Sequence, residues 1–266
     1  MRHSYEKAEL EGFFRKIGEK LPSHITVFLL GGGAMAFRNQ KTATKDLDLV
    51  FENGKECKEF VSAIKELAFK EKMRLEIEYE DMEARGGIWE EPGGFRLDLF
   101  VKKVCGNLQL SQGVKERGEL LGKYGNLSVR MLSNEDIMLF KAVTERSGDA
   151  DDIAAIVRNA SIDWNVLLKE CQFQSKERNW YASVLNKMEE IKQKYGIDAP
   201  IIPKLRKASE TRALKEAYER RRKAGKTREE AMAEFKAMGF TRKEIAHLLQ
   251  KPPNRHMQSR RNVVLT

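Results

Sequence analysis

A glycine-rich turn between two apolar segments constrains the fold of this chain more than any other feature of its sequence. The apolar run Ile25–Leu30 is followed at once by the three glycines 31–33. A short apolar run bounded by glycine is typical of a buried strand. The segment 46–51 then alternates between faces, so the side chains of Asp46 and Asp48 point the same way. The sequence therefore predicts two strands, the second of which presents two carboxylates side by side.

Two neighbouring carboxylates repel each other unless a cation lies between them. Hard oxygen ligands on a rigid strand suit magnesium, and Asp98, a lone acid in an apolar strand segment, is a candidate third ligand for a two-metal site. By itself Asp98 would be read as an outward-facing residue of a half-exposed strand, but beside Asp46 and Asp48 the catalytic interpretation is favoured. Glu76 and Glu78 also alternate, although the acids that flank them favour a solvated face, so they rank second.

Apolar periodicity predicts an α+β protein, in which a mixed sheet is followed by helices only. Ser133 and the acidic residues after it predict a helix N-terminus where the helical part begins. We expect a mixed-sheet core at 1–132, a helical extension at 133–200 and a basic helical region at 201–266. The expected elements are a helix at 4–20, strands at 25–30, 47–51, 74–79 and 95–101, and helices at 134–146, 149–158, 162–173, 176–194 and 203–223.

Composition excludes several classes of protein. With 41% hydrophobic and 33% charged residues the chain fits a globular protein, and no apolar run approaches the roughly 18 residues of a membrane span. The first residues lack the layout of a signal peptide, so we expect a cytoplasmic protein with no membrane partner. The three cysteines and four histidines are scattered without metal-ligand spacing, which favours buried, reduced thiols and argues against zinc.

The glycine and aspartate pattern resembles the nucleotidyltransferases of the DNA polymerase beta superfamily. The resemblance is greater to its small prokaryotic branch, which includes toxins of toxin–antitoxin pairs, where Gly-Gly-x-Ala-hydrophobic precedes Arg-x-Thr-x-Asp-hydrophobic-Asp. The arginine of that pattern is replaced here by Thr42, which leaves open whether Arg38, Lys41 or Lys45 meets the triphosphate. The matching positions are Gly31, Gly32, Ala34, Met35, Thr44, Asp46 and Asp48.

A second block also carries the resemblance. The helical element that follows the catalytic sheet in this branch has the order Lys, Arg, Asp, Asp, found here as Lys141, Arg146, Asp149 and Asp152. The resemblance implies that Lys141 reaches the nucleotide phosphates as a compact point charge. Pairing among surface helices is an equally good interpretation for Arg146 and Asp152.

From the resemblance we expect a polymerase beta-like catalytic core that binds a nucleoside triphosphate and two Mg²⁺ ions, or Mn²⁺, about 3.5 to 4 Å apart. Asp46 and Asp48 would hold both ions. Asp98 would complete the second metal site and help to activate the acceptor hydroxyl. The triphosphate would contact Gly31, Gly32 and Lys141, with Arg38, Lys41 and Thr44 as further nucleotide-binding candidates.

The last quarter of the chain carries the whole basic excess. Residues 201–266 hold 18 lysines and arginines against 7 acidic residues, a net charge of +11, within a total of +9. Such asymmetry indicates a polyanionic partner. The helices expected after Thr227 and Thr241, with the turn at Pro252–Pro253, resemble a helix-turn-helix whose last helix would contact DNA or RNA through Arg255, Gln258, Arg260 and Arg261. A bundle for packing or dimerisation is the alternative.

Together these features predict a magnesium-dependent nucleotidyltransferase that acts on a nucleic-acid 3′ end, releases pyrophosphate and has a possible cognate protein partner. The alternative is a DNA-binding regulator or a toxin–antitoxin component, in which the transferase fold is a scaffold or modifies a protein. The three clustered aspartates argue against a pure scaffold, because a structural descendant has no use for costly neighbouring acids.

Overall fold

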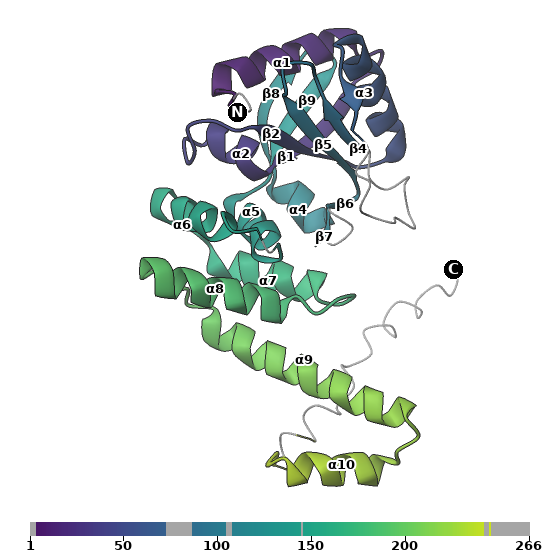
Figure 1. Ribbon diagram of the computed structural model, residues 1–266, viewed down its shortest axis with the longest axis vertical. Coiled ribbons are helices and arrows are strands. Elements are labelled where there is room, and N and C mark those ends of the chain that lie inside the picture. Colours follow the sequence, from purple (N-terminus) through teal and green to yellow (C-terminus); the bar gives the residue numbers. More distant parts are fainter. Residues whose placement is uncertain (1–3, 73–86, 105–107, 145, 242–244, 246–266) are drawn as a thin grey trace, which may run out of the picture. The chain divides into compact units, whose positions relative to one another are not determined.

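The computed structural model describes residues 4–72, 87–104, 108–144, 146–241 and 245 (Figure 1). The chain divides into two compact units, Met1–Leu205 and Arg206–Thr266. The first unit holds the sheet and most of the helices, and the second is helical in its described part. The fold is α+β, as the sequence predicts.

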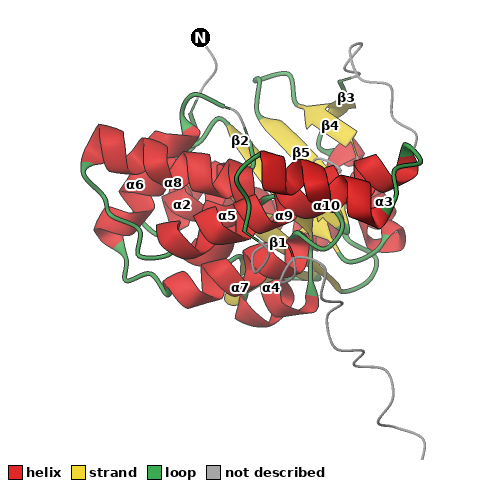
Figure 2. Ribbon diagram, turned by 90° about the horizontal axis from the view of Figure 1, so that it is seen from below, coloured by secondary structure: helices red, strands yellow, loops and turns green. Residues whose placement is uncertain are grey.

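One mixed sheet forms the centre of the first unit. Its main path has the order β3-β4-β5-β2-β1-β9-β8, with β6 and β7 attached beside β5. Figure 2 shows β2, β5 and β4 side by side. In the described residues the strands are β1 (Ile25–Leu30), β2 (Asp46–Phe51), β3 (Lys70–Glu71), β4 (Gly87–Glu90), β5 (Arg96–Val101), β6 (Lys103–Val104), β7 (Leu108–Gln109), β8 (Glu119–Tyr124) and β9 (Leu127–Met131).

The central strands run in different directions. β1 pairs antiparallel with β2 and parallel with β9, whereas β2 pairs parallel with β5. Leu47 and Leu49 are fully buried, since alternate side chains of β2 point into the core. Asp46 and Asp48, at the beginning of β2, lie on its other face.

The helices of the first unit form two groups. α1 packs against β8, β9 and α3, and α3 packs against β2 and β5. Helices α5 to α8 pack on one another beyond the sheet (Figure 1). These helices are α1 (Lys7–Lys20), α2 (Gly31–Phe37), α3 (Gly54–Glu66), α4 (Gln112–Arg117), α5 (Asn134–Ala142), α6 (Asp149–Asn159), α7 (Trp164–Gln174) and α8 (Tyr181–Tyr195).

Short polar side chains begin several of these helices. Ser133 accepts a hydrogen bond from the backbone N–H of Asp136, which confirms the N-cap expected for α5. Asn53 and Ser111 cap α3 and α4 in the same way. Asn53 follows β2 and Ser111 follows β7, so each cap marks where the backbone changes from extended to helical.

The second unit contains a helical hairpin. α9 (Ile202–Lys223) continues from the first unit into the second and is followed by α10 (Arg228–Ala237). Glu234 of α10 accepts a hydrogen bond from Arg221 Nε at 2.7 Å and contacts Lys226, while the Arg221 guanidinium lies over the ring of buried Phe235. Gly239, at φ 94°, follows the helix, where a left-handed backbone conformation favours glycine.

The helices expected at 4–20 and between 134 and 223 are all observed, as α1 and α5 to α9, whereas β3, β4 and β6 to β9 were not predicted. The strand 25–30 is confirmed, and those at 47–51 and 95–101 differ by one residue at their first position. The glycines expected to form a turn are part of a helix, because α2 begins at Gly31. Residues 87–90 form β4 against β5, a strand that the sequence did not predict. The strand expected at 74–79 lies outside the described residues.

Candidate functional site

Strand register brings the three predicted aspartates to one face of the sheet, near the beginning of β2 and β5. Asp48 of β2 is directly opposite Asp98 of β5 and also opposite Leu30, the last residue of β1. Because β2 and β5 are parallel and in register, Asp48 and Asp98 belong to the same face. Asp46 precedes Asp48 by two residues and shares that face. Asp98 is 6% exposed, whereas Asp46 and Asp48 are half-buried, so the group opens to solvent on the side of β2.

The backbone of α2 comes directly against this group. Gly31 has φ 64°, and a Cβ at this position would overlap the Asp48 carboxylate. A Cβ at Gly32 would lie 2.7 Å from Thr44 Oγ1. Both positions therefore require glycine, the first for its backbone angle as well as for space. The close approach explains why the glycines follow β1 without any intervening residue.

Arg96, which was not predicted as a site residue, contacts the acidic group through Asp98. Its guanidinium donates two hydrogen bonds to the Asp98 carboxylate. They measure 2.5 Å from Nε to Oδ1 and 2.6 Å from Nη2 to Oδ2. Asp98, Asp46 and Asp48 all act to raise the pKa of Arg96. The signal was available in the segment Arg96-Leu97-Asp98, since residues two apart on a strand share a face.

The electrostatic environment of Asp48 differs from that of an ordinary surface acid. Burial of the carboxylate, with the negative charges of Asp98 and Asp46, raises the pKa of Asp48 to about 7. The positive charges of Arg146 and Lys141 act in the opposite direction. Cations from the helical part of the unit are thus close enough to influence the acidic group.

Lys141 lies in a network of charges that joins α5 to α6. Its ammonium is 2.6 Å from Asp152 Oδ2 and 3.2 Å from Asp149 Oδ1. Burial alone would lower the pKa of Lys141, but the two carboxylates outweigh that effect and raise it. The hydroxyl of Thr144 also contacts Asp149. The structure therefore brings together Lys141, Asp149 and Asp152, and Arg146 acts on Asp48 from the exposed surface nearby.

The other nucleotide-binding candidates lie along the segment that joins α2 to β2. Lys41 Nζ is 3.0 Å from Asp152 Oδ1. Buried Thr44 donates its hydroxyl hydrogen bond to the backbone oxygen of Asp46, at 2.8 Å. Arg38 follows the C-terminal end of α2, the opposite end from Gly31, and its Nη2 lies 3.4 Å from Glu119 Oε2. Lys41 therefore shares Asp152 with Lys141, whereas Arg38 pairs with Glu119 of β8.

The donor set of the acidic group fits a divalent cation. Asp46 and Asp48 offer hard oxygen ligands on one strand, and a cation between them would offset the repulsion that raises the pKa of Asp48. Within the described residues, no three Asp, Glu, His or Cys side chains are gathered to hold a metal ion by themselves. Substrate phosphates and water would have to complete the coordination, as is usual for magnesium.

Several predicted residues lie outside the described part of the chain. They are Glu76 and Glu78 of the second-ranked acidic pair and Arg255, Gln258, Arg260 and Arg261 of the expected recognition helix. Of the cysteines, Cys57 and Cys171 are buried free thiols, and burial raises the pKa of each to about 12. In the portion that the structure describes, every helix is too short or too polar to span a bilayer.

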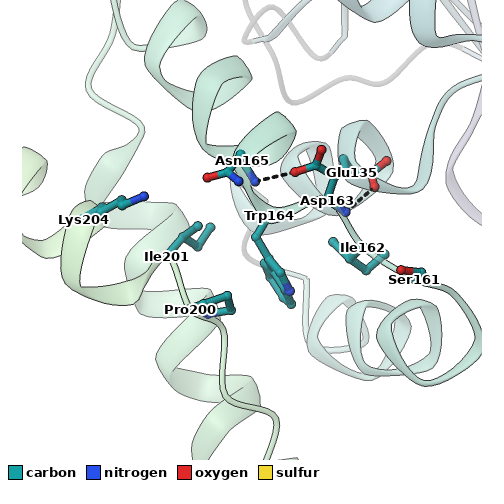
Figure 3. A pocket seen from close by; sticks show the side chains of 9 residues that line it. All are labelled: Glu135, Ser161, Ile162, Asp163, Trp164, Asn165, Pro200, Ile201 and Lys204. Atoms are coloured by element: carbon teal, nitrogen blue, oxygen red, sulfur yellow. Dashed lines mark hydrogen bonds between the residues drawn. The ribbon is translucent and has the colours of Figure 1, made fainter.

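A pocket of about 520 Å³ lies in the helical part of the first unit (Figure 3). Asp163 accepts a hydrogen bond from the backbone N–H of Asn165, while the N–H of Asp163 donates to Glu135. These acids therefore serve helix and loop structure. The lining residues, none of which was predicted as a site residue, are Glu135, Ser161, Ile162, Asp163, Trp164, Asn165, Pro200, Ile201 and Lys204.

Comparison with known proteins gives one family match. Residues 9–196 match the sequence profile of the family described as "Nucleotidyltransferase of unknown function (DUF6036)", which is more than half of the chain. No functionally curated protein matches the sequence. A similar solved structure is that of the lincosamide antibiotic adenylyltransferase LnuA with lincomycin bound: the identity is 14%, the TM-score is 0.42, and the match covers 59% of this chain and 100% of that one.

Proposed function

The chain belongs to the family Nucleotidyltransferase of unknown function (DUF6036). On this premise we propose that it is a magnesium-dependent enzyme. It transfers a nucleoside monophosphate to the 3′ end of RNA or DNA. The acceptor oxygen forms a bond with the α-phosphorus of a nucleoside triphosphate. The bond between that phosphorus and the oxygen bridging to the β-phosphorus breaks, and pyrophosphate leaves.

The observation that carries the proposal is the register of β2 and β5. It sets Asp48 opposite Asp98, two residues from Asp46, with the backbone of Gly31 against the Asp48 carboxylate. A protein gains no stability from like charges at such a place. A carboxylate cluster against a glycine backbone is suited to a ligand that brings a metal ion and phosphates.

The residues of the chain have separate roles in this proposal. Gly31 and Gly32 let the phosphates approach the backbone, and Lys141 supplies a positive charge to the triphosphate. Asp98 accepts the proton of the acceptor hydroxyl. Both oxygens of Asp98 already accept from Arg96, but each carboxylate oxygen has a second acceptor position.

Asp46 and Asp48 would hold the magnesium, or manganese, with Asp98 as a further ligand. When bound, the ions neutralise charge on the phosphates and orient the reacting oxygens. Coordination by Asp98 would require a change in its contacts with Arg96, which occupies the carboxylate in the structure.

The second unit supplies the contact with nucleic acid in this proposal. Four exposed basic residues lie at the end of α9 and the beginning of α10, namely Arg220, Arg222, Lys223 and Arg228. Removing residues 206–266 should abolish most binding to long RNA or DNA but leave the binding of magnesium and nucleotide. The binding that is lost should be the salt-sensitive part, since each phosphate contact adds roughly 0.9 to the log–log salt slope on duplex DNA. Full, equally salt-dependent binding by the truncated chain would contradict this role.

The experiment that tests the enzymatic proposal is a transfer assay with purified protein. Each α-labelled nucleoside triphosphate is incubated with magnesium and with pooled RNA, DNA or protein as acceptor. We expect label in RNA or DNA and equimolar pyrophosphate. Label in protein would replace the nucleic-acid acceptor with a protein acceptor. The absence of label from all three pools would favour the scaffold alternative.

Two variants control this assay. Asp48→Asn should lose transfer, because it removes a carboxylate from the acidic group. Asp198→Asn makes the same chemical change at an exposed residue that pairs with Lys192 at 2.8 Å, and it should retain full transfer. Equal transfer by both variants would reject the assignment of the site.

A further inference from the structure

A single carboxylate, that of Asp152, contacts two lysines from distant parts of the sequence. Lys141 Nζ of α5 lies 2.6 Å from Oδ2. Lys41 Nζ, from the segment between α2 and β2, lies 3.0 Å from Oδ1 and 3.2 Å from Oδ2. Burial would raise the pKa of Asp152, but Lys141 and Lys41 together lower it. The carboxylate therefore stays charged and joins the two ammonium groups.

The two lysines differ in how firmly they are held. The Lys141 side chain is 13% exposed and is held by Asp149 as well as by Asp152, one helical turn apart on α6. The Lys41 side chain is 41% exposed, and the contact that the structure gives its ammonium is with Asp152. Asp152 thus has more influence on the position of Lys41 than on that of Lys141.

The segment carrying Lys41 is otherwise fixed at its ends. Gln40 Nε2 donates to Asn134 Oδ1 at 3.0 Å, and the backbone of Thr44 pairs with that of Tyr5. This segment leads directly into Asp46 of β2. Lys41 therefore lies between two anchored points, close in sequence to the acidic group, and its side chain is oriented by Asp152.

Both ammonium groups keep the capacity to bind an anion. An ammonium has three donors. Lys141 uses two of them on Asp149 and Asp152, and Lys41 directs its contacts to Asp152. Lys141 and Arg146 both act on Asp48 of the acidic group, so the lysine pair lies near the proposed metal site. Ammonium donors beside a metal ion suit the oxygens of a polyphosphate.

We propose that Asp152 is a positioning residue of the nucleotide site: it holds the ammonium groups of Lys41 and Lys141 together, so that both bind one polyphosphate chain. The inference rests on the proposed function. It adds a specific dependence, because Lys41 contributes to polyphosphate binding only while Asp152 holds it in place.

A double-mutant cycle tests this dependence. Inorganic tripolyphosphate with magnesium is the probe, since it presents the phosphate chain without a base, and its affinity is measured by calorimetry. In the wild-type background Lys41→Met should weaken binding about tenfold, as expected for loss of one charge-assisted hydrogen bond. In the Asp152→Asn background the same substitution should change the affinity less than about twofold.

Asp151→Asn is the matched control background. Asp151 is the preceding residue on α6, and it pairs with Lys194 at 2.9 Å on an exposed surface. Lys41→Met should again cost about tenfold there. Equal losses in the Asp152→Asn and Asp151→Asn backgrounds would overturn the inference and leave Asp152 with a purely structural role. Thermal unfolding of each variant identifies any loss that arises from misfolding.

The probe also separates this inference from the proposed function. Coupled binding of tripolyphosphate in a protein that transfers no nucleotide would support the role of Asp152 and reject the transferase. Nucleotide transfer without coupling between Lys41 and Asp152 would support the transferase and reject the role of Asp152. A wild-type protein that binds no tripolyphosphate would overturn the inference.

Discussion

Two groups of buried charges in the first unit are built in opposite ways. Arg117 of α4 donates to Asp136 at 2.6 and 3.0 Å and to Glu170 at 2.7 Å. Hydroxyls of Ser133 and Ser111 donate to the same two carboxylates, at 2.7 and 2.9 Å. Every charge in this Arg117 group has direct partners, and the group joins α4, α5 and α7.

The acidic group of Asp46, Asp48 and Asp98 has three carboxylates against one paired cation, Arg96. Burial and the charges of Asp98 and Asp46 raise the pKa of Asp48, and the opposing charges of Arg146 and Lys141 do not cancel that shift. Buried ion pairs hold a fold together when their partners are complete, whereas an uncompensated group costs free energy. The comparison supports the proposal that the Arg117 group serves the structure and that the acidic group binds a cation.

The largest expected effect is that of Asp48→Asn on catalysis. Removing this carboxylate should reduce nucleotide transfer on the order of 10⁴-fold, the scale seen when one member of a catalytic group is lost. The rate of pyrophosphate release checks this. Circular dichroism and thermal unfolding should show that the fold is intact, and a folded Asp48→Asn protein with normal turnover would remove the distinction between the two groups.

Arg117→Met should have the opposite profile. It leaves Asp136 and Glu170 buried without their cation, which should lower the free energy of unfolding by about 3 to 5 kcal/mol. Urea unfolding measures the change. Lys115→Met, on the same helix, removes a more exposed pair with Glu52 at 2.9 Å and should cost no more than about 1 kcal/mol. Similar losses in the free energy of unfolding for both variants would show that the Arg117 group stabilises the fold no more than an exposed ion pair does.

Lys141→Ala should weaken nucleotide binding by about 1.5 to 3 kcal/mol, since it removes a charge-assisted contact with the phosphates. Equilibrium dialysis with labelled nucleotide and magnesium measures the loss. Lys194→Ala removes a lysine that pairs with Asp151 on the surface and should leave affinity unchanged. If both variants bind as the wild type does, Lys141 belongs with the structural charges.

The smallest expected effect concerns stability without metal. Asp48→Asn removes one of three neighbouring charges, so it should stabilise the metal-free protein by about 1 kcal/mol, the scale of one pKa unit. Magnesium should narrow this difference by stabilising the wild type. The melting temperatures of the two proteins with and without magnesium measure it, and a less stable metal-free Asp48→Asn protein would show that the acids do not repel.

The sequence predicted structure best where a local pattern has one physical meaning, as an apolar run does for a buried strand. Apolar runs predict β1, β2 and β5, and the spacing of Asp46 and Asp48 predicts a shared face. The opposition of Asp48 and Asp98 depends on register between strands far apart in sequence, which no local pattern encodes. The strands β6 to β9 and helix α4, all after Val101, were not predicted.

The charged contacts were less predictable than the strands. The pairing of Arg117 with Asp136 and Glu170 joins three helices, and that of Lys41 with Asp152 spans two distant segments. Such pairs depend on how the helices pack, because charged residues occur at many surface positions in a chain that is 33% charged. Arg96 with Asp98 had a local signal, the two-residue spacing along β5.

The central claim is that the acidic group performs chemistry while the Arg117 group maintains the fold. The most direct measurement is the rate of pyrophosphate release per folded molecule for the wild type, Asp48→Asn and Arg117→Met, at a temperature where all three remain folded. The account predicts release by the wild type and by Arg117→Met at similar rates, and none above background by Asp48→Asn. Release by Asp48→Asn at the wild-type rate would contradict it.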